Sequence, residues 1–453
     1  MDYRIEHDTM GEIAVPKEAL WGAQTQRSLE HFQIAGETMP LGVVYALVKI
    51  KKAAALTNFA FGKLDEKRKD LIVRAADEVL EGKWDKEFPL SLWQTGSGTQ
   101  TNMNVNEVLG GRGNALAGEK CLHPNDHVNL SQSSNDVFPA AMHLAALASL
   151  RALYPAVENL IATFKRLEEE NASIIKTGRT HLQDAVPLRF SQEISGWRNA
   201  LELDLEALRM SEKGLYALAL GGTAVGTGLN SPKGFSEEVT RRLSEMTGLP
   251  LYGAENKFQA LTSKSALVTS HGAIKALAAD YYKITTDVRF LSTGPRCGLG
   301  EILIPENEPG SSIMPGKVNP TQCESAAMVS LQVMANDVAV GLAASQGNFE
   351  LNVFMPLLIG NFLRSAALLR DSFLSFEKFC ASGIKANEEK MKENLERSLM
   401  NVTALSPLLG YEKAALVAKT AHRENKTLKE VVLEMKLLNE EEFDEAMDPE
   451  KMV

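Results

Sequence analysis

Three stretches of the chain carry apolar residues at alternating spacings of three and four, which predicts long helices buried along one stripe. The stripes are Leu150, Leu153, Val157, Leu160, Phe164 and Leu167, then Leu277, Tyr281, Ile284, Val288 and Leu291, then Met328, Leu331, Ala335, Val338 and Leu342. At about 1.5 Å per residue, helices of about 25 to 30 residues are about 40 Å long. Several such helices predict a bundle, and Pro155 predicts a kink in the first of them.

These stripes are too long and too apolar for the other helices of one chain to cover them. We therefore expect helices of neighbouring subunits to pack together. A monomeric helical solenoid is the alternative, but the chain shows no repeat of about 30 to 47 residues.

Composition excludes several classes of protein. A chain of 453 residues predicts two or three domains, and 44% apolar with 23% charged residues is typical of a soluble globular protein. A net charge of −10 disfavours nucleic acid as a partner. The charged N-terminus lacks the apolar core of a signal peptide, so we expect a cytoplasmic protein. The four cysteines are scattered, with no disulfide framework or zinc pattern.

The segment from Gly310 to Pro320, GSSIMPGKVNP, combines flexible and rigid backbone with reactive side chains. Two glycines and two prolines predict a lid that is mobile at some points and stiff at others. Lys317 and Asn319 suit a small carboxylate, and Ser311 or Ser312 would meet the reacting carbon. A phosphate-binding P-loop does not fit, because five residues separate the glycines and Val318 follows the lysine. A structural turn is the stronger alternative.

A second glycine-hydroxyl loop, from Trp93 to about Thr99, leads into a predicted helix. The free N–H groups and the positive dipole end of that helix favour an anion. Ser97 and Thr99 are also good helix caps, so simple capping is an equal alternative. Farther along, Ser133-Ser134-Asn135-Asp136 ends in a capping residue before the first long helix.

His181 is the best catalytic candidate of the eight histidines, because turn residues and hydroxyls surround it in Gly178–Leu188. Imidazole titrates near about 6.5 and can carry a proton in either direction around neutrality. A lone histidine is nevertheless more often structural.

Two other motifs suggest a metal site and a dinucleotide-binding loop, but their residues do not support these functions well. His123 and His127 stand four residues apart, but Pro124 breaks a helix that would align them and no third metal ligand is evident. The glycine-rich stretch 219–230 lacks a β-α-β pattern and a ribose-binding acid, so it is interpreted as a loop between long helices.

Together these segments resemble class II fumarases, in the fumarase and aspartase superfamily. The likeness rests on GSSIMPGKVNP followed by Thr321-Gln322-Cys323-Glu324, on the loops around Ser97 and His181, and on Leu20–Ser28, and it covers nearly the whole chain. It implies an all-α fold of three domains (1–132, 133–388 and 389–453) with a central long-helix bundle. It also implies a homotetramer with a 20-helix core, in which three subunits form each active site.

The resemblance also implies the reversible, stereospecific hydration of fumarate to (S)-malate, with no metal and no organic cofactor. The implied catalytic residues are His181, Ser311, Glu324 and Lys317. The implied substrate-binding residues are Ser97, Gly98, Thr99, Ser133, Ser134, Asn135, Thr180, Ser312, Lys317, Val318 and Asn319. A secondary anion site would comprise Lys120, His123, Pro124, Asn125 and Asp126.

Two positions differ from the residues usual in the family, and two other functions are disfavoured. Lys120 and Ser191 stand where many relatives have arginine and glycine, and lysine cannot form a bidentate fork with a carboxylate. A sister lyase acting on aspartate or argininosuccinate is disfavoured by His181 and by Thr321–Glu324. A structural protein, such as the lens crystallins recruited from this superfamily, is disfavoured by the intact set of catalytic residues.

Overall fold

The computed structural model describes residues 2–453, which divide into two compact units. Unit 1 comprises the chain as far as Tyr154 together with Leu205–Ala278 and Leu331–Arg370. Unit 2 comprises Pro155–Asp204, Ala279–Ser330 and Asp371–Val453. Five long helices contain residues of both units, namely α5 (Ser134–Glu170), α6 (Phe190–Ser211), α9 (Ser265–Leu291), α10 (Thr321–Ala344) and α11 (Met355–Phe379). The prediction of several long helices is therefore confirmed.

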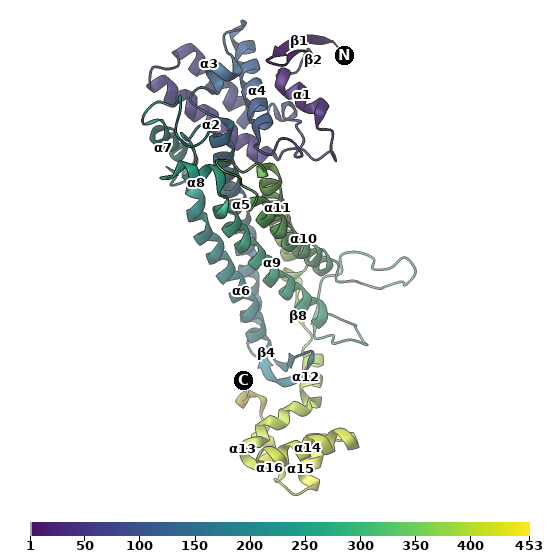
Figure 1. Cartoon of the computed structure of the whole chain (residues 1–453). Coiled ribbons are helices and arrows are strands. Elements are labelled where there is room, and N and C mark those ends of the chain that lie inside the picture. The colour runs from purple at the N-terminus through teal and green to yellow at the C-terminus, as the bar shows by residue number, and fades with distance from the viewer. Residues whose placement is uncertain (1) are drawn as a thin grey trace. The chain divides into compact units, whose positions relative to one another are not determined.

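Unit 1 begins with a hairpin of β1 (Tyr3–Asp8) and β2 (Gly11–Pro16), which lies beside α1 (Ala23–His31) (Figure 1). Turn residues mixed with short apolar pairs over residues 1 to 40 predict a lightly structured arm, and that prediction is wrong. The guanidinium of Arg4 donates to the carbonyls of Pro16, Ala19 and Trp21 and ties the hairpin to the segment that follows.

Unit 1 also contains several shorter helices and strands. The helices are α2 (Leu41–Ala60), α3 (Glu66–Leu80), α4 (Thr99–Ala117), α7 (Phe235–Thr247) and α8 (Lys257–Thr262), with single turns at Asp85–Glu87, Pro124–Val128 and Glu212–Tyr216. Strands β5 (Ala217–Leu218) and β6 (Tyr252–Gly253) form a short parallel pair. The sequence predicts a helix from Leu41 to Phe61 that ends at Gly62, and this end is confirmed, because Gly62 has φ +66°.

The three predicted stripes differ in how they are covered. Every stripe residue of α5 and α9 is buried. The α10 stripe is exposed instead, with Met328 at 66%, Val338 at 62% and Leu342 at 62%, while the opposite face, including Val333 and Val340, enters the core. By length and composition alone α5 and α10 are apolar enough to cross a membrane, but the apolar window is 72% buried in α5 and 33% in α10.

Unit 2 joins part of the helix bundle to a hairpin and a small helical region. Tyr281 of α9 stacks on Phe373 of α11 with ring centroids 4.1 Å apart, and Phe164 packs against Trp197. The hairpin is formed by β3 (Ile175–Thr180) and β4 (Gln183–Arg189). A second antiparallel pair joins β7 (Ile302–Leu303) to β8 (Lys385–Ala386).

The C-terminal helices α13 to α16 gather together in Figure 1. They follow α12 (Glu388–Arg397) and comprise α13 (Ser406–Leu409), α14 (Tyr411–Glu424), α15 (Leu428–Glu434) and α16 (Glu440–Ala446), with single turns at Ala381–Gly383, Leu399–Leu405 and Pro449–Lys451. Val417, Val432 and Phe443 belong to their shared core. The Glu- and Lys-rich amphipathic segments 428–436 and 440–447 predict two helices, which are confirmed. The division into three domains stays a prediction.

Candidate active site

The loop before α4 brings three hydroxyl groups together in unit 1. Thr99 Oγ1 lies 2.8 Å from Ser97 Oγ and 2.8 Å from Ser134 Oγ, at the N-termini of α4 and α5. Gly98 adopts φ +70°, and a Cβ there would lie 2.3 Å from the Phe138 ring. Two helix N-termini and a chain of hydroxyls form a suitable cradle for a carboxylate.

The carboxylate of Asp136 fixes the turn Ser133–Asn135. Helix α5 begins at Ser134, two residues before the predicted capping residue, so Asp136 lies in the first turn and reaches back to the Ser133 N–H at 2.9 Å. Its other oxygen accepts from the N–H groups of Gly221 and Thr223 at 2.9 and 3.1 Å. Burial raises the pKa of Asp136, and these N–H groups and Lys51 oppose that effect.

Lys51 is fully buried next to the same turn. Its ammonium donates to Asn129 Oδ1 at 2.8 Å and to Gln132 Oε1 at 3.1 Å. Burial lowers the pKa of Lys51 to about 7, against the opposing attraction of Asp136. Buried polar groups of this kind make the turn a rigid part of the fold.

In unit 2, His181 occupies the two-residue turn between β3 and β4. Thr180 pairs with Gln183, and His181 and Leu182 have φ of +57° and +60°. Positive φ at both central residues is typical of a type I′ turn, which normally takes Asn-Gly. Residues held in this region cost about 1–3 kcal/mol each and cluster at functional sites. Leu182 is 70% exposed, so the turn is presented at the surface of the chain.

The 310–320 loop is closed on itself by four hydrogen bonds. The Gly310 N–H donates to the Lys317 carbonyl at 2.7 Å, and Asn319 Nδ2 donates to the Gly310 carbonyl at 2.7 Å. Ser311 Oγ accepts from the N–H groups of Ile313 and Met314 at 3.2 and 3.0 Å. Two N–H donors stabilise negative charge on the Ser311 oxygen.

The resemblance to class II fumarases implies that Glu324 pairs with His181, but the two are not joined within one chain. Glu324 Oε1 lies 3.7 Å from Arg289 Nη2, and across residues 2–453 no hydrogen bond or ion pair joins it to His181. The Lys317 side chain is exposed and has no such partner in the described chain. Thr180 adjoins His181, and Ser312 and Val318 lie in the Ser311 loop.

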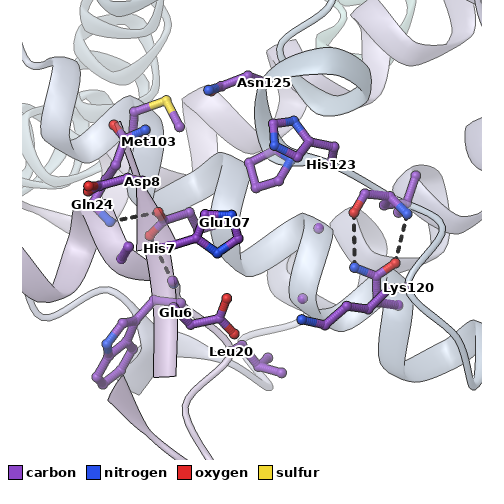
Figure 2. Close-up of a pocket in the computed structure, with 18 of the residues that line it drawn as sticks. Glu6, His7, Asp8, Leu20, Gln24, Met103, Glu107, Lys120, His123 and Asn125 are labelled. Atoms are coloured by element: carbon purple, nitrogen blue, oxygen red, sulfur yellow. Dashed lines mark hydrogen bonds between the residues drawn. The ribbon is translucent and has the colours of Figure 1, made fainter. Parts of the chain in front are cut away.

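A cavity of about 1080 Å³ lies in unit 1 and includes most of the predicted secondary anion site. Figure 2 shows Glu6 and His7 of β1 on one side and Lys120 and His123 on the other. Pro124 and Asn125 also line the cavity, while Asp126 lies beside it with Oδ2 3.3 Å from His123 Nδ1. The sequence analysis did not predict that β1 forms one wall of this cavity. None of the predicted catalytic residues lines this cavity.

A Ser-His-Asp array elsewhere in unit 1 resembles a hydrolase triad. His271 Nε2 lies 2.9 Å from Ser365 Oγ, and its Nδ1 lies 2.8 Å from Asp337 Oδ1. Ser365 and His271 are both 0% exposed, and Asn336 also donates to the Ser365 hydroxyl. Because the Ser365 hydroxyl is buried, a substrate cannot reach it. The array instead joins α9, α10 and α11.

Comparisons with known proteins agree on one family. A family model described as lyase matches residues 11–335, and one described as fumarase C C-terminus matches 402–453. Class II fumarate hydratases of Campylobacter jejuni and Bacillus cereus are 55% and 56% identical, each over 100% of this chain and 99% of the relative. The crystal structure of class II fumarase from Schistosoma mansoni is 45% identical with a TM-score of 0.98, covering 100% of this chain and 99% of that one. The chain therefore belongs to the class II fumarate hydratase family, with the mostly helical fold that its sequence predicts.

Proposed function

We propose that this protein is a metal-independent hydro-lyase that interconverts fumarate and (S)-malate in the tricarboxylic acid cycle. The observation that carries the proposal is identity of 54–57% with class II fumarate hydratases, over the full chain. The acid, base and carboxylate-binding residues expected of such an enzyme are present.

In the elimination direction, the Ser311 alkoxide takes the C3 proton of malate and becomes a neutral hydroxyl, and the electron pair of that C–H bond moves into the adjacent carboxylate. The resulting aci-carboxylate dianion needs positive charge and hydrogen-bond donors, which Lys317 and Asn319 supply together with N–H groups of the loop. The C2–O bond then breaks, and the departing hydroxyl takes a proton from His181 through a water molecule. Water and fumarate are the products.

The geometry supports an activated Ser311. A serine hydroxyl is a weak base in water, but the N–H groups of Ile313 and Met314 both donate to Ser311 Oγ. Such donors favour the charged form of the oxygen. Ser312 and Val318 lie in the same loop, so their proposed contacts with substrate would form as this loop covers the site.

We assign the two substrate carboxylates to the remaining groups. Ser97, Gly98 and Thr99 with Ser133, Ser134 and Asn135 offer hydroxyls, an amide and the ends of two helices. Thr180 adds a hydroxyl next to His181. Glu324 would orient the imidazole once a neighbouring subunit brings the two together.

A homotetramer with active sites shared by three subunits accounts for two features of the single chain. The apolar α10 stripe is exposed although its spacing is that of a packed helix, and a second copy of the chain supplies a matching stripe. His181 and Glu324 are unpaired with each other within residues 2–453, as expected if their partners belong to other subunits.

We also propose a secondary anion site at Lys120, His123, Pro124, Asn125 and Asp126, and a cytoplasmic location. The cavity beside β1 supports the first, because Lys120 and His123 both line it. Burial lowers the pKa of the neighbouring His127, with the Arg68 charge acting in the same direction. Positive charge there would come from Lys120 and Arg68 rather than from His127.

The test is to follow the loss of fumarate absorbance in water, with aspartate and argininosuccinate as control substrates. Ser311→Ala and His181→Asn should each lower kcat by about 100-fold or more while the oligomer persists. His422→Asn, which changes an exposed histidine of α14, is the matched control and should leave kcat unchanged. Parental turnover in either of the first two variants would remove that residue from the mechanism.

A further inference from the structure

We propose that Glu301 is a positioning residue for His181, because its buried carboxylate anchors the hairpin whose turn presents the imidazole. The inference rests on the proposed function, in which His181 supplies the proton to the departing hydroxyl. Glu301 lies 120 positions from His181 in the chain, and no local motif links the two.

Four hydrogen-bond and ion-pair contacts converge on this carboxylate. Oε1 accepts from Arg179 Nη2 at 2.8 Å and from Asn394 Nδ2 at 2.9 Å. Oε2 accepts from Arg179 Nη1 at 2.9 Å and lies 3.1 Å from Lys176 Nζ. Arg179 and Lys176 both belong to β3, so one carboxylate holds the strand that leads directly to His181.

The Glu301 side chain is 0% exposed, which makes these contacts obligatory. Burial alone would raise its pKa, but the Arg179 hydrogen bonds and the Lys176 charge outweigh that effect and lower the pKa. The carboxylate is therefore ionised. A bidentate pair with arginine fixes direction as well as distance, so Arg179 is held two residues before the imidazole.

The backbone of Glu301 is itself fixed. Its N–H donates to the Leu291 carbonyl at the end of α9 at 2.9 Å, and its carbonyl accepts from the Asn387 N–H at 2.8 Å, just before α12. The hairpin is thus anchored to two helix ends through a single side chain.

The turn needs such an anchor because its own residues do not favour it. His181 and Leu182 have positive φ without the Asn-Gly pair that makes a type I′ turn easy. Without the Glu301 contacts, we expect the turn to sample other geometries and the imidazole to leave its productive position. Displacements of about 1 Å at such a group can cost about 100-fold in rate.

The competing explanation is that Glu301 only stabilises the fold. Glu301→Gln keeps the size of the side chain but places an amide N–H₂ among the donors of Arg179, Lys176 and Asn394. We expect kcat to fall about 10- to 100-fold, with KM changed less than threefold and the oligomeric state retained. Hydrogen–deuterium exchange should become faster in residues 175–189 and remain parental elsewhere.

Glu193→Gln is the matched control, because Glu193 Oε2 contacts Lys176 Nζ at 2.8 Å but does not touch Arg179. It should retain kcat within about twofold and the parental exchange of the hairpin. If Glu301→Gln does not fold, Asn394→Ala removes one neutral donor from Oε1 without leaving a buried charge unpaired. That variant should show a smaller loss of kcat with the same local increase in exchange.

Parental kcat in folded Glu301→Gln or Asn394→Ala would overturn the proposal, whatever the exchange. A loss of kcat without faster exchange in the hairpin would also overturn it, since Glu301 would then act by another route. If the parental protein does not hydrate fumarate, the proposed function fails instead. The exchange comparison would still decide whether Glu301 anchors the hairpin.

Discussion

The Asp136 carboxylate accepts a hydrogen bond at 2.9 Å from the backbone N–H of Gly221, which lies 85 residues later in the chain. The same oxygen accepts from Thr223, and the other oxygen accepts from Ser133. Asp136 therefore closes the first turn of α5 and fastens it to the glycine-rich 219–230 loop. Asn135 adds a parallel link through Nδ2 to the Ala224 carbonyl at 2.9 Å.

Asp136→Asn should weaken substrate binding more than it slows turnover. An amide has one oxygen, so at least one buried backbone N–H would lose its acceptor, at a cost of about 1–3 kcal/mol. The proposed carboxylate-binding residues 133–135 lie in this turn, and we expect KM for fumarate to rise about tenfold. Steady-state kinetics and thermal melts measure both effects.

Asp65→Asn is the control for replacing a capping carboxylate by an amide, since Asp65 Oδ1 caps α3 through the Arg68 N–H at 2.9 Å. It should lower the melting temperature slightly and leave KM unchanged. Equal changes of KM in the two variants would show that Asp136 has no specific link to substrate.

Leu182→Gly should stabilise the hairpin. An L-residue in the left-handed region costs about 1–2 kcal/mol, and glycine avoids that cost while gaining freedom in the unfolded chain. Because Leu182 is 70% exposed, little burial is lost, and we expect a net gain of about 0.5 kcal/mol. Val186→Gly on β4 is the comparison and should destabilise. A lower melting temperature for Leu182→Gly would mean that Leu182 is packed in the assembled protein.

The periodic stripes were sufficient to predict the long helices, but not which side of α10 faces the core. That helix is apolar on both sides, and the chain buries Val333 and Val340 rather than the regular stripe. The β1–β2 hairpin was missed because Tyr3 and Ile5 are 59% and 62% exposed, so its alternation does not mark a buried face.

The candidate site was predicted from motifs, which name residues that meet a ligand but not residues that hold those in place. Arg179 and Glu301 stand 122 residues apart, so no pattern within a motif predicts their pair. The positive φ of His181 could not be predicted from the sequence either, because neither His nor Leu is a usual residue for a type I′ turn.

Charges placed on the exposed α10 stripe should dissociate the oligomer. Leu331 and Val338 are 54% and 62% exposed within the chain, so glutamate at both positions leaves the protomer core intact. Between packed helices, however, a carboxylate would be buried without a partner, which costs several kcal/mol. Light scattering should report a smaller species, and hydratase activity should be lost with it.

Leu408→Glu in the C-terminal helices, at a side chain that is 61% exposed, is the control and should leave the assembly unchanged. If Leu331→Glu with Val338→Glu keeps the parental mass, α10 does not form the subunit interface.

Lys264→Met should stabilise the protein in a pH-dependent way. Lys264 is 1% exposed, and among residues 2–453 its ammonium donates to the backbone carbonyls of Ala260, Leu261 and Ser263, with no carboxylate partner. Burial lowers its pKa from 10.5 to about 7. Above about pH 7 the folded chain has released a proton that the unfolded chain retains until about pH 10.5. Stability contributed by this residue therefore rises with pH across that window, by up to about 1.4 kcal/mol per unit.

Methionine carries no charge to bury, so the variant should exceed the parent in stability by about 1–3 kcal/mol at pH 7. Its advantage should shrink as the pH approaches 10, because the free-energy cost of removing the proton from the parental lysine on folding falls as the pH nears the pKa of the unfolded chain. Thermal melts at pH 7, 8 and 9 measure the difference, and Lys165→Met at an exposed position of α5 provides the control. A difference between parent and variant that stays constant over this range would show that the Lys264 amine keeps its proton in the folded protein.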